Sequence, residues 1–313
     1  MHTDERGADE PQELRAHEVA HVCAVYGFGF RGFRRLDGGT VNTNFLVETD
    51  RGEQYVLTVL SGRDRSATAL AAGTMRWLAA SGYPTSAPLD GDGRGPRGRT
   101  VALRPYIAGT VHDVLPVRLL GEAGAVLARL HELGLPPREL RLPSGGRRLP
   151  REAVAEIGAF ADREFAAWLG DRLADPPLSD ENLCMTHGDL FADNLVERAD
   201  GTLAVLDWET ASVDDPLLDL GMAVMGLGVD ADGRLRAERL RALVDGYRRV
   251  RPLDGADMDR LRELARYAGA MVAYFRYRRR GQARSRAYTA MVAAVDDLPT
   301  VWPQAYEPVG TAG

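Results

Sequence analysis

The sequence predicts an α+β protein built from two lobes, a small β-rich N-terminal lobe and a larger α-helical C-terminal lobe. Three observations support this prediction. Strand-like segments are concentrated before residue 108, whereas helical hydrophobic periodicity dominates after it. A length of 313 residues suits two lobes. A hydrophobic fraction of 45% with 27% charged residues is sufficient to build a core.

The first part of the chain alternates between short strand-like runs and two helical stretches. Residues 1–12 are polar and aperiodic, so we expect a disordered tail there. The N-terminal lobe is expected to comprise residues 13–107. Its expected elements are, in order, a helix at 13–26, strands at 29–36, 41–49 and 54–60, a helix at 66–80 and a strand at 100–107.

The second part, residues 108–313, is mostly helical by its hydrophobic spacing. Helices are expected at 119–133, 151–169, 235–249, 256–279 and 283–295. Between them, residues 186–209 have the pattern of a loop, a short strand, a turn and another short strand. A small lobe and a large lobe predict a cleft between them, a usual place for a binding site.

Composition excludes several classes of function. The formal net charge of −6 argues against nucleic acid or an anionic membrane as the main partner. No apolar run approaches the roughly 20 residues that span a bilayer. The acidic, polar N-terminus does not resemble a signal peptide, and Cys23 and Cys184 do not form a disulfide framework, so a cytoplasmic location is expected. All 39 basic residues are arginines, which excludes a P-loop lysine.

The strongest chemical pattern is Thr186–Glu209, THGDLFADNLVERADGTLAVLDWE. Protein kinases place a metal-binding Asn five residues after the Asp that acts as base, and Asn194 follows Asp189 at that spacing. Asp207 ends the predicted hairpin that follows, and Mg²⁺ prefers such oxygen ligands. In the alternative interpretation, Asp189 is a turn residue and Asn194 is a helix cap. The five-residue spacing between them would then be a coincidence. The pattern therefore predicts Mg²⁺-dependent phosphoryl transfer.

These residues resemble the aminoglycoside phosphotransferase and choline kinase superfamily, which has a bilobal protein-kinase-like fold. Within it, the type II homoserine kinase branch is the most similar, and the resemblance extends from about residue 30 to 225. The segments that carry it are the nucleotide loop GGTVNTNFLVET, the strand YVLTVL, the hinge YIAGT, the helix LGEAGAVLARLHEL, the catalytic loop HGDLFADN and the segment DDPLLDLG.

The resemblance implies a role for each matching residue. Asp189 is the expected catalytic base, with Asn194 and Asp207 as metal ligands. His187 is expected to orient the loop through hydrogen bonds, and Glu209 either supports the metal site or faces solvent beside an arginine. The nucleotide, ATP or GTP, is expected at Gly38, Gly39, Thr40, Asn42, Thr58, Arg104 and Tyr106.

Two further polar residues are expected to be structural. His131 ends an amphipathic helix, which favours a buried supporting role over catalysis. Asp219 lies in a segment typical of a helix start, so it is expected to cap that helix or brace the catalytic loop. Cys184 is expected to be a small buried residue.

The chain departs from the kinase pattern at the phosphate-binding lysine. Kinases pair this strand lysine with a helix Glu, but the expected position is Thr58 and the following helix contains no Glu. The absence of both the lysine and the Glu is physically reasonable, because the Glu without its lysine would be an uncompensated charge near phosphate. Backbone N–H groups of a glycine-rich turn and nearby arginines are the expected replacements, namely Gly38, Gly39, Thr40, Arg63, Arg65 and Arg104.

The fold class does not name the hydroxyl acceptor. A polycationic antibiotic would be recognised by acidic residues, for which the candidates are Glu209, Asp214, Asp215 and Asp230. A hydroxy-amino acid would need an arginine near its carboxylate, and the basic stretch 275–286 is a candidate anchor for an acidic acceptor. We favour an antibiotic or secondary metabolite, with an amino alcohol or hydroxy-amino acid as the alternative. A third hypothesis is a non-catalytic nucleotide-binding pseudokinase, because the lysine and Glu are missing.

Overall fold

The computed structural model describes residues 13–36, 42–60, 65–91, 93–279 and 286–306. The chain divides into two compact units, residues 1–107 and residues 108–313. Gly38, Gly39, Thr40 and Arg63, which were expected near the nucleotide, lie outside the described residues, as does the tail 1–12. No helix in the described part of the chain combines the length and the apolar character needed to cross a bilayer.

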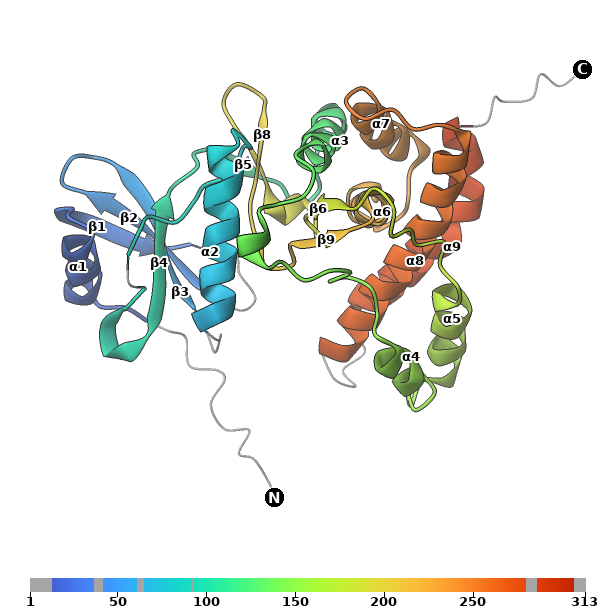
Figure 1. Cartoon of the computed structure of the whole chain (residues 1–313), viewed down its shortest axis with the longest axis horizontal. Coiled ribbons are helices and arrows are strands. Elements are labelled where there is room, and N and C mark those ends of the chain that lie inside the picture. The colour runs from blue at the N-terminus through green and yellow to red at the C-terminus, as the bar shows by residue number, and fades with distance from the viewer. Residues whose placement is uncertain (1–12, 37–41, 61–64, 92, 280–285, 307–313) are drawn as a thin grey trace, which may run out of the picture. The chain divides into compact units, whose positions relative to one another are not determined.

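The first unit is built on an antiparallel sheet of four strands in the order β1-β2-β3-β4 (Figure 1). The strands are β1 (Phe30–Arg35), β2 (Thr43–Thr49), β3 (Gln54–Leu60) and β4 (Thr100–Pro105). The helix α1 (Ala16–Val25) packs its apolar side chains against one face of this sheet. The longer helix α2 (Arg65–Ala80) follows β3. The alternation of side chains along each strand therefore separates a core-forming face from an opposite face.

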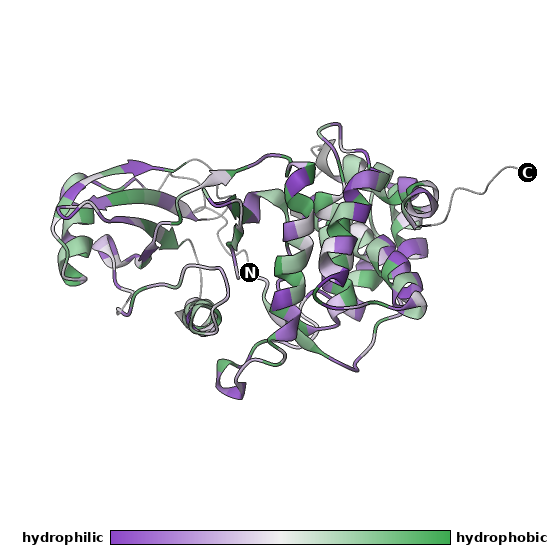
Figure 2. Cartoon of the chain, turned by 90° about the horizontal axis from the view of Figure 1, so that it is seen from above, coloured by the Kyte–Doolittle hydropathy of each residue, from purple (hydrophilic) through white to green (hydrophobic). Residues whose placement is uncertain are grey.

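The second unit is a helical assembly that contains two small sheets (Figure 1). Its helices are α3 (Val117–Glu132), α4 (Arg151–Ile157), α5 (Arg163–Leu173), α6 (Pro216–Leu227), α7 (Ala237–Arg248), α8 (Gly255–Arg279) and α9 (Arg286–Tyr306). α3 packs on α7, and α8 lies between α6 and α9. Hydrophobic and hydrophilic segments alternate along these helices in Figure 2, as expected for helices with one buried side.

Glycines allow α3 and α7 to pack closely against each other. A Cβ added to Gly124 of α3 would lie 1.9 Å from the carbonyl oxygen of Leu243 on α7, and one added to Gly246 would lie 2.1 Å from that of Gly121. Any larger side chain at these positions would force the two helices apart.

The small sheets hold the predicted catalytic segment in place. β5 (Thr110–Val111), β7 (Leu195–Glu197) and β8 (Leu203–Val205) form one sheet, and β6 (Cys184–Thr186) pairs with β9 (Ser212–Asp214) in the other. Because Thr186 at the end of β6 pairs with Ser212 at the start of β9, the loop that leaves β6 lies beside the loop that joins β8 to β9.

Two sequence-based helix boundaries were wrong. The single helix expected at 151–169 is divided into α4 and α5, because the chain leaves the helix near Gly158 and Asp162 caps a new one by accepting from the Phe165 amide. The helix expected at 283–295 extends to Tyr306 through Pro299 and Pro303. Each proline removes one helical hydrogen bond without ending the helix, and Arg241 donates to the carbonyl oxygens of Gln304 and Ala305 in its last turn, which have no donor within the helix.

An ion-pair cluster joins Glu197 of β7 to His112, just after β5, and to Arg118 at the start of α3, and it should make stability depend on pH. Arg118 and then His112 lower the pKa of Glu197 from 4.5 to about 2 through hydrogen bonds. Because the folded pKa is depressed, the stabilisation is fully present above about pH 4.5 and is lost as the pH falls toward 2.

We expect a Glu197→Gln variant to lose less unfolding free energy than the wild type between about pH 6 and about pH 3. Urea unfolding at the two pH values measures this difference. An identical pH dependence in the two proteins would show that the cluster does not contribute.

Candidate active site

The candidate catalytic loop follows β6 and is fixed mainly through its backbone. The amide of Asp189 donates to Nδ1 of His187 over 3.2 Å, and Nδ2 of Asn194 donates to the carbonyl oxygen of Asp189 over 2.9 Å. The Phe191 amide donates to the same oxygen over 2.9 Å. Local hydrogen bonds thus hold the backbone of Asp189, while its side chain remains 40% exposed and reachable by a substrate.

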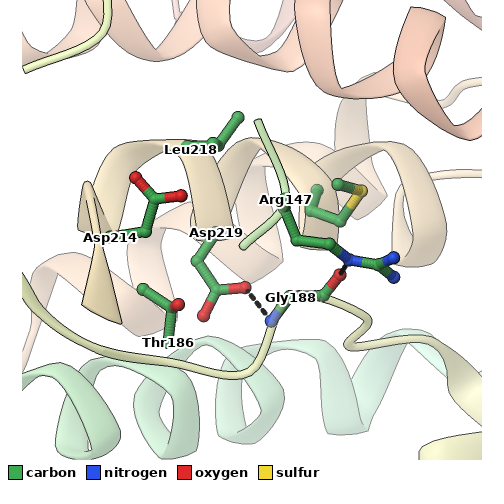
Figure 3. A pocket seen from close by; sticks show the side chains of 7 residues that line it. Arg147, Thr186, Gly188, Asp214, Leu218 and Asp219 are labelled. Atoms are coloured by element: carbon green, nitrogen blue, oxygen red, sulfur yellow. Dashed lines mark hydrogen bonds between the residues drawn. The ribbon is translucent and has the colours of Figure 1, made fainter. Parts of the chain in front are cut away.

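The carboxylate of Asp219, on the first turn of α6, supports this loop through hydrogen bonds to its backbone. Its Oδ2 accepts from the His187 amide and its Oδ1 from the Gly188 amide, both over 2.7 Å. Figure 3 shows the carboxylate reaching the backbone of Gly188. The helix itself is capped by Asp215, whose side chain accepts from the Leu217 amide. Of the two roles expected for Asp219, the structure therefore places it as a brace rather than a cap.

The brace continues into the helical core. Nε2 of His131 lies 3.1 Å from Oδ2 of Asp219, and its Nδ1 lies 2.7 Å from the Tyr247 hydroxyl. Burial raises the pKa of Asp219, but the hydrogen bond and charge of His131, with the backbone donors of the loop, lower it more, so the net pKa lies below the ordinary value. Both His131 and Asp219 are essentially inaccessible to solvent. His131 is thus buried in the helical core, where it supports Asp219, as expected from its place in the helix.

His187 connects the catalytic loop to the hairpin that follows. Its Nδ1 accepts from the Asp189 amide, so Nε2 carries the ring proton and donates to the Leu206 carbonyl oxygen over 2.9 Å. The ring stacks edge-on against Trp208 with 4.8 Å between centroids. Both ring nitrogens are engaged and the residue is fully buried, an environment that agrees with the orienting role expected for His187.

The hairpin brings the two expected metal ligands to one end. Leu195 pairs with Val205 in the β7–β8 ladder, and the Leu206 amide donates to the Asn194 carbonyl oxygen over 2.9 Å. Asp207 follows directly, with a left-handed φ of +59°. This conformation is tolerated by Asp better than by most residues and costs of the order of 1 kcal/mol. Backbone strain of this kind is typical of functional sites, so it supports Asp207 as a residue whose carboxylate must be held in one position.

The donor chemistry fits a divalent cation shared with phosphates. Among the described residues, no three His, Cys, Asp or Glu side chains gather as in a metal site made by protein alone. One carboxylate from Asp207 and one amide oxygen from Asn194 are instead what Mg²⁺ typically takes beside substrate phosphates and water. Glu209 is exposed, and its backbone amide lies 3.4 Å from Oδ1 of Asp207.

Negative charge accumulates at this end of the loop. Partial desolvation raises the pKa of Asp193, and the neighbouring carboxylates of Asp189 and Asp207 raise it further, while Arg276 acts in the opposite direction. The guanidinium of Arg276 also lies over the Phe191 ring at 5.7 Å. A bound cation would relieve this mutual repulsion, which is consistent with a metal-dependent site.

One residue of the site was missed by sequence reasoning. Nη2 of Arg147 lies 2.9 Å from Oδ1 of Asp189, and its Nε donates to the Gly188 carbonyl oxygen. Arg147 precedes Gly188 by 41 positions and belongs to no motif that relates it to the catalytic loop. The only local signal was the Gly-Gly-Arg-Arg sequence at 145–148 inside a proline-flanked loop.

The first unit contains the remaining nucleotide candidates. Thr58 occupies the position expected for a lysine, and its hydroxyl donates to Oδ1 of Asn44 over 2.7 Å. Thr58 pairs with Ala102, two residues from Arg104 on the same strand, so Thr58 and Arg104 share the sheet face opposite the α1 core. Tyr106 donates its amide to the Gln54 carbonyl oxygen, and Asn42 lies just before β2.

Three of the four acidic candidates for a polycationic acceptor are used within the second unit. Asp214 pairs with Arg148 at 2.8 Å and is buried, with its pKa raised chiefly by desolvation. Asp215 pairs with Arg260 and caps α6. Asp230 pairs with Arg236 and accepts from its own turn. Asp214 and Asp215 are therefore buried and paired, which removes them from an acidic acceptor surface, while Asp230 is partly exposed beside its arginine.

The comparison with family models decides the class of protein. Residues 32–253 match the model described as the phosphotransferase enzyme family. The chain belongs to this family. The matched residues include the braced loop, both expected metal ligands and Arg147, so the geometry described above lies within the part of the chain that the phosphotransferase model covers.

Known relatives indicate which branch of the family this phosphotransferase resembles. It is 31% identical over 258 residues to a homoserine kinase of Methylobacillus flagellatus, covering 79% of this chain and 76% of the relative. It is 30% identical over 275 residues to a homoserine kinase of Paramagnetospirillum magneticum, covering 82% and 84%. The resemblance to the homoserine kinase branch is confirmed, and the phosphotransferase is a small-molecule kinase.

Solved structures confirm the fold. A spectinomycin phosphotransferase, solved with ADP and spectinomycin, superposes with a TM-score of 0.66 at 15% identity over 93% of this chain and 99% of that one. A choline kinase of Streptococcus pneumoniae gives 0.62 at 15% identity over 90% and 98%. At such identities the likeness concerns architecture alone, and it establishes the kinase-like α+β fold.

Proposed function

We propose that this phosphotransferase uses ATP or GTP and a divalent cation, Mg²⁺ in the first instance, to phosphorylate the hydroxyl of a small hydroxy-amino acid of the homoserine type. The observation that carries the proposal is Asp189, a solvent-reachable carboxylate on a backbone fixed from three sides, next to the Asn194 and Asp207 hairpin. That arrangement is suited to receiving a hydroxyl proton during phosphoryl transfer.

The reaction assigned to the site is a direct displacement. The acceptor hydroxyl donates its proton to Asp189 while its oxygen forms a bond to the γ-phosphorus. The bond from that phosphorus to the bridging oxygen breaks, and the nucleoside diphosphate leaves with the electron pair. A divalent cation held by Asn194 and Asp207 would supply charge neutralisation on the phosphates. The protein contributes position and orientation, with little covalent chemistry of its own.

Two observations favour a hydroxy-amino acid over the antibiotic that the sequence first suggested. The relatives at 30–31% identity over most of both chains are homoserine kinases, whereas the antibiotic phosphotransferase at 15% identity supports only the fold. The acidic residues that would bind a polycation are instead paired with arginines within the unit. The positive charge of Arg276 acts on Asp193 beside the catalytic loop, which suits an acceptor that carries a carboxylate.

An acceptor screen tests the proposal. The purified full-length chain is incubated with Mg²⁺ and either ATP or GTP, and the phosphorylated products are detected by ³¹P NMR. The acceptors are homoserine, serine, choline, spectinomycin, a macrolide and the amino alcohol that lacks the carboxylate of homoserine. We expect the highest kcat/KM for homoserine and a clear loss for the matched amino alcohol. Transfer only to the antibiotics would instead assign a resistance-type kinase, and no transfer to any acceptor would contradict the proposal.

The metal assignment predicts the behaviour of an Asp207→Asn variant. We expect its apparent affinity for Mg²⁺ to fall at least about tenfold, because even groups that only support metal ligands have effects of that size. Titration of Mn²⁺ in the presence of ADP, followed by electron paramagnetic resonance, measures the affinity without turnover. A Glu181→Gln variant changes an exposed carboxylate of the same unit and serves as the control. Equal Mn²⁺ affinity in both variants would remove Asp207 from the metal site.

A further inference from the structure

We infer that Arg147 is a positioning residue for the catalytic base: it holds the carboxylate of Asp189 in the orientation that receives the acceptor proton. The inference rests on the proposed function, since it concerns how the same base is presented. No catalytic motif of the sequence includes Arg147, and its role follows from its contacts alone.

The guanidinium of Arg147 binds two consecutive residues of the loop. Nη2 contacts Oδ1 of Asp189 at 2.9 Å, while Nε donates to the Gly188 carbonyl oxygen. The two contacts use neighbouring N–H groups of a rigid, planar fork, so they fix the carboxylate relative to the peptide that precedes it. Figure 3 shows Arg147 lying along the backbone of Gly188. Since the ion pair uses Oδ1, the acceptor hydroxyl is assigned to Oδ2.

The segment that carries Arg147 is itself held on both sides. The Gly145 amide donates to the Val213 carbonyl oxygen and the Val213 amide donates to the Pro143 carbonyl oxygen, both over 2.9 Å. These bonds attach the segment to β9. On the other side, the Leu149 amide lies 3.3 Å from the Tyr267 hydroxyl on α8.

The next residue along the chain anchors the segment further. Arg148 pairs with Asp214 at 2.8 Å and with Asp180 at 2.7 Å. The Arg147 guanidinium, only 18% exposed in its side chain, also lies over the Phe275 ring at 5.7 Å. A flexible surface arginine has no such support, and this preorganisation is what a positioning role requires.

Gly188 accommodates the arginine. A Cβ at this position would lie 2.9 Å from Cγ of Arg147 and 2.9 Å from the Thr210 carbonyl oxygen, and the φ of Gly188 is +78°. The glycine between the orienting His187 and the base Asp189 therefore serves the left-handed turn and also leaves room for the Arg147 side chain to lie flat on the loop.

The backbone of Asp189 is fixed by hydrogen bonds, but its side chain is 40% exposed. An exposed carboxylate explores several orientations unless a partner selects one. The ion pair with Arg147 makes that selection, so loss of Arg147 should impair the transfer step more than the binding of either substrate. A misplacement of about 1 Å can cost on the order of 10²-fold in rate.

Steady-state kinetics of Arg147→Ala and Arg147→Gln test the inference once the wild type has been shown to transfer phosphate. We expect kcat to fall by about 10²-fold with KM for acceptor and nucleotide nearly unchanged. Added guanidinium should restore part of the activity of Arg147→Ala and none to Asp189→Asn. Arg147→Lys should retain an intermediate rate, because lysine supplies the charge without the planar fork. Arg129→Ala, which removes an arginine from a surface ion pair on α3, is the matched control.

The outcomes separate the inference from the proposed function. A wild type that phosphorylates nothing contradicts the proposed function, and crystal structures of wild type and Arg147→Gln then still test the positioning role through the orientation of Asp189. An active wild type with unchanged kcat in the variants overturns the inference. A rise in KM confined to carboxylate-bearing acceptors, at constant kcat, also overturns it and makes Arg147 an acceptor-binding residue. If Arg147→Ala does not fold, Arg147→Gln and Arg147→Lys carry the same comparison.

Discussion

Replacement of Asp189 by Asn is expected to lower kcat for phosphate transfer by roughly 10²–10⁴-fold, the contribution usual for a general base. The substitution keeps the size of the side chain, and the backbone bonds of Asp189 with His187 and Asn194 do not involve the carboxylate. Binding of nucleotide and the melting temperature should therefore change little. Single-turnover transfer from ATP or GTP to homoserine, or to whichever acceptor the screen identifies, measures the effect.

The appropriate control for this variant is Asp200→Asn. Asp200 is an exposed carboxylate of the same unit in the turn between β7 and β8, where it accepts from Thr202. Its rate should match the wild type. If Asp189→Asn transferred phosphate at the wild-type rate, the base would have to be sought among other groups, beginning with Asp193.

Replacement of Asp219 by Ala is expected to have the largest effect on folding, with a loss of about 3–5 kcal/mol in the free energy of unfolding. The carboxylate is buried and accepts from two loop amides and His131. Its removal leaves these donors without their acceptor in a site that water reaches poorly, and each unsatisfied buried donor costs about 1–3 kcal/mol. Urea denaturation followed by circular dichroism measures the loss.

Two further variants separate the role of Asp219 from general sensitivity of the fold. Asp219→Asn keeps one acceptor oxygen and should lose less stability than the Ala variant, while still disordering the loop. Asp171→Ala removes an exposed carboxylate from α5 and should stay within about 0.5 kcal/mol of the wild type. A similar small effect for Asp219→Ala would mean that the catalytic loop is held by its own backbone bonds alone.

Much of the fold could be predicted from the sequence because its signals are local. The β2–β3 hairpin has clear alternation and a turn at Gly52, which has a φ of +79°. The spacing between Asp189 and Asn194 and the hairpin that ends at Asp207 lie within one short stretch, and their hydrogen-bonded arrangement follows from that stretch. Such patterns depend on neighbours in the chain, so they are visible without knowledge of the tertiary structure.

The features that escaped prediction depend on contacts between distant segments. Arg147 reaches the catalytic loop because β9 and α8 hold its segment, and no periodicity encodes that arrangement. The part of α9 beyond Pro299 and Pro303 contacts Arg241 of α7, which donates to carbonyl oxygens of its last turn. Asp214 and Asp215 have the composition of an acidic surface, but Arg148 and Arg260 pair with them in the interior. In each case a tertiary partner overrides what the local sequence favours.

The buried contact of Asp219 with the His187 and Gly188 amides also has a kinetic consequence. Loop amides usually exchange their hydrogens with solvent quickly, because loops open without disturbing the rest of a protein. In this chain the two amides are closed by a side chain from the first turn of α6, which is in turn held by His131 of α3 and, through that ring, by Tyr247 of α7. We therefore expect exchange at these two amides to be slower than in an ordinary surface loop, because their opening disturbs contacts that join three helices.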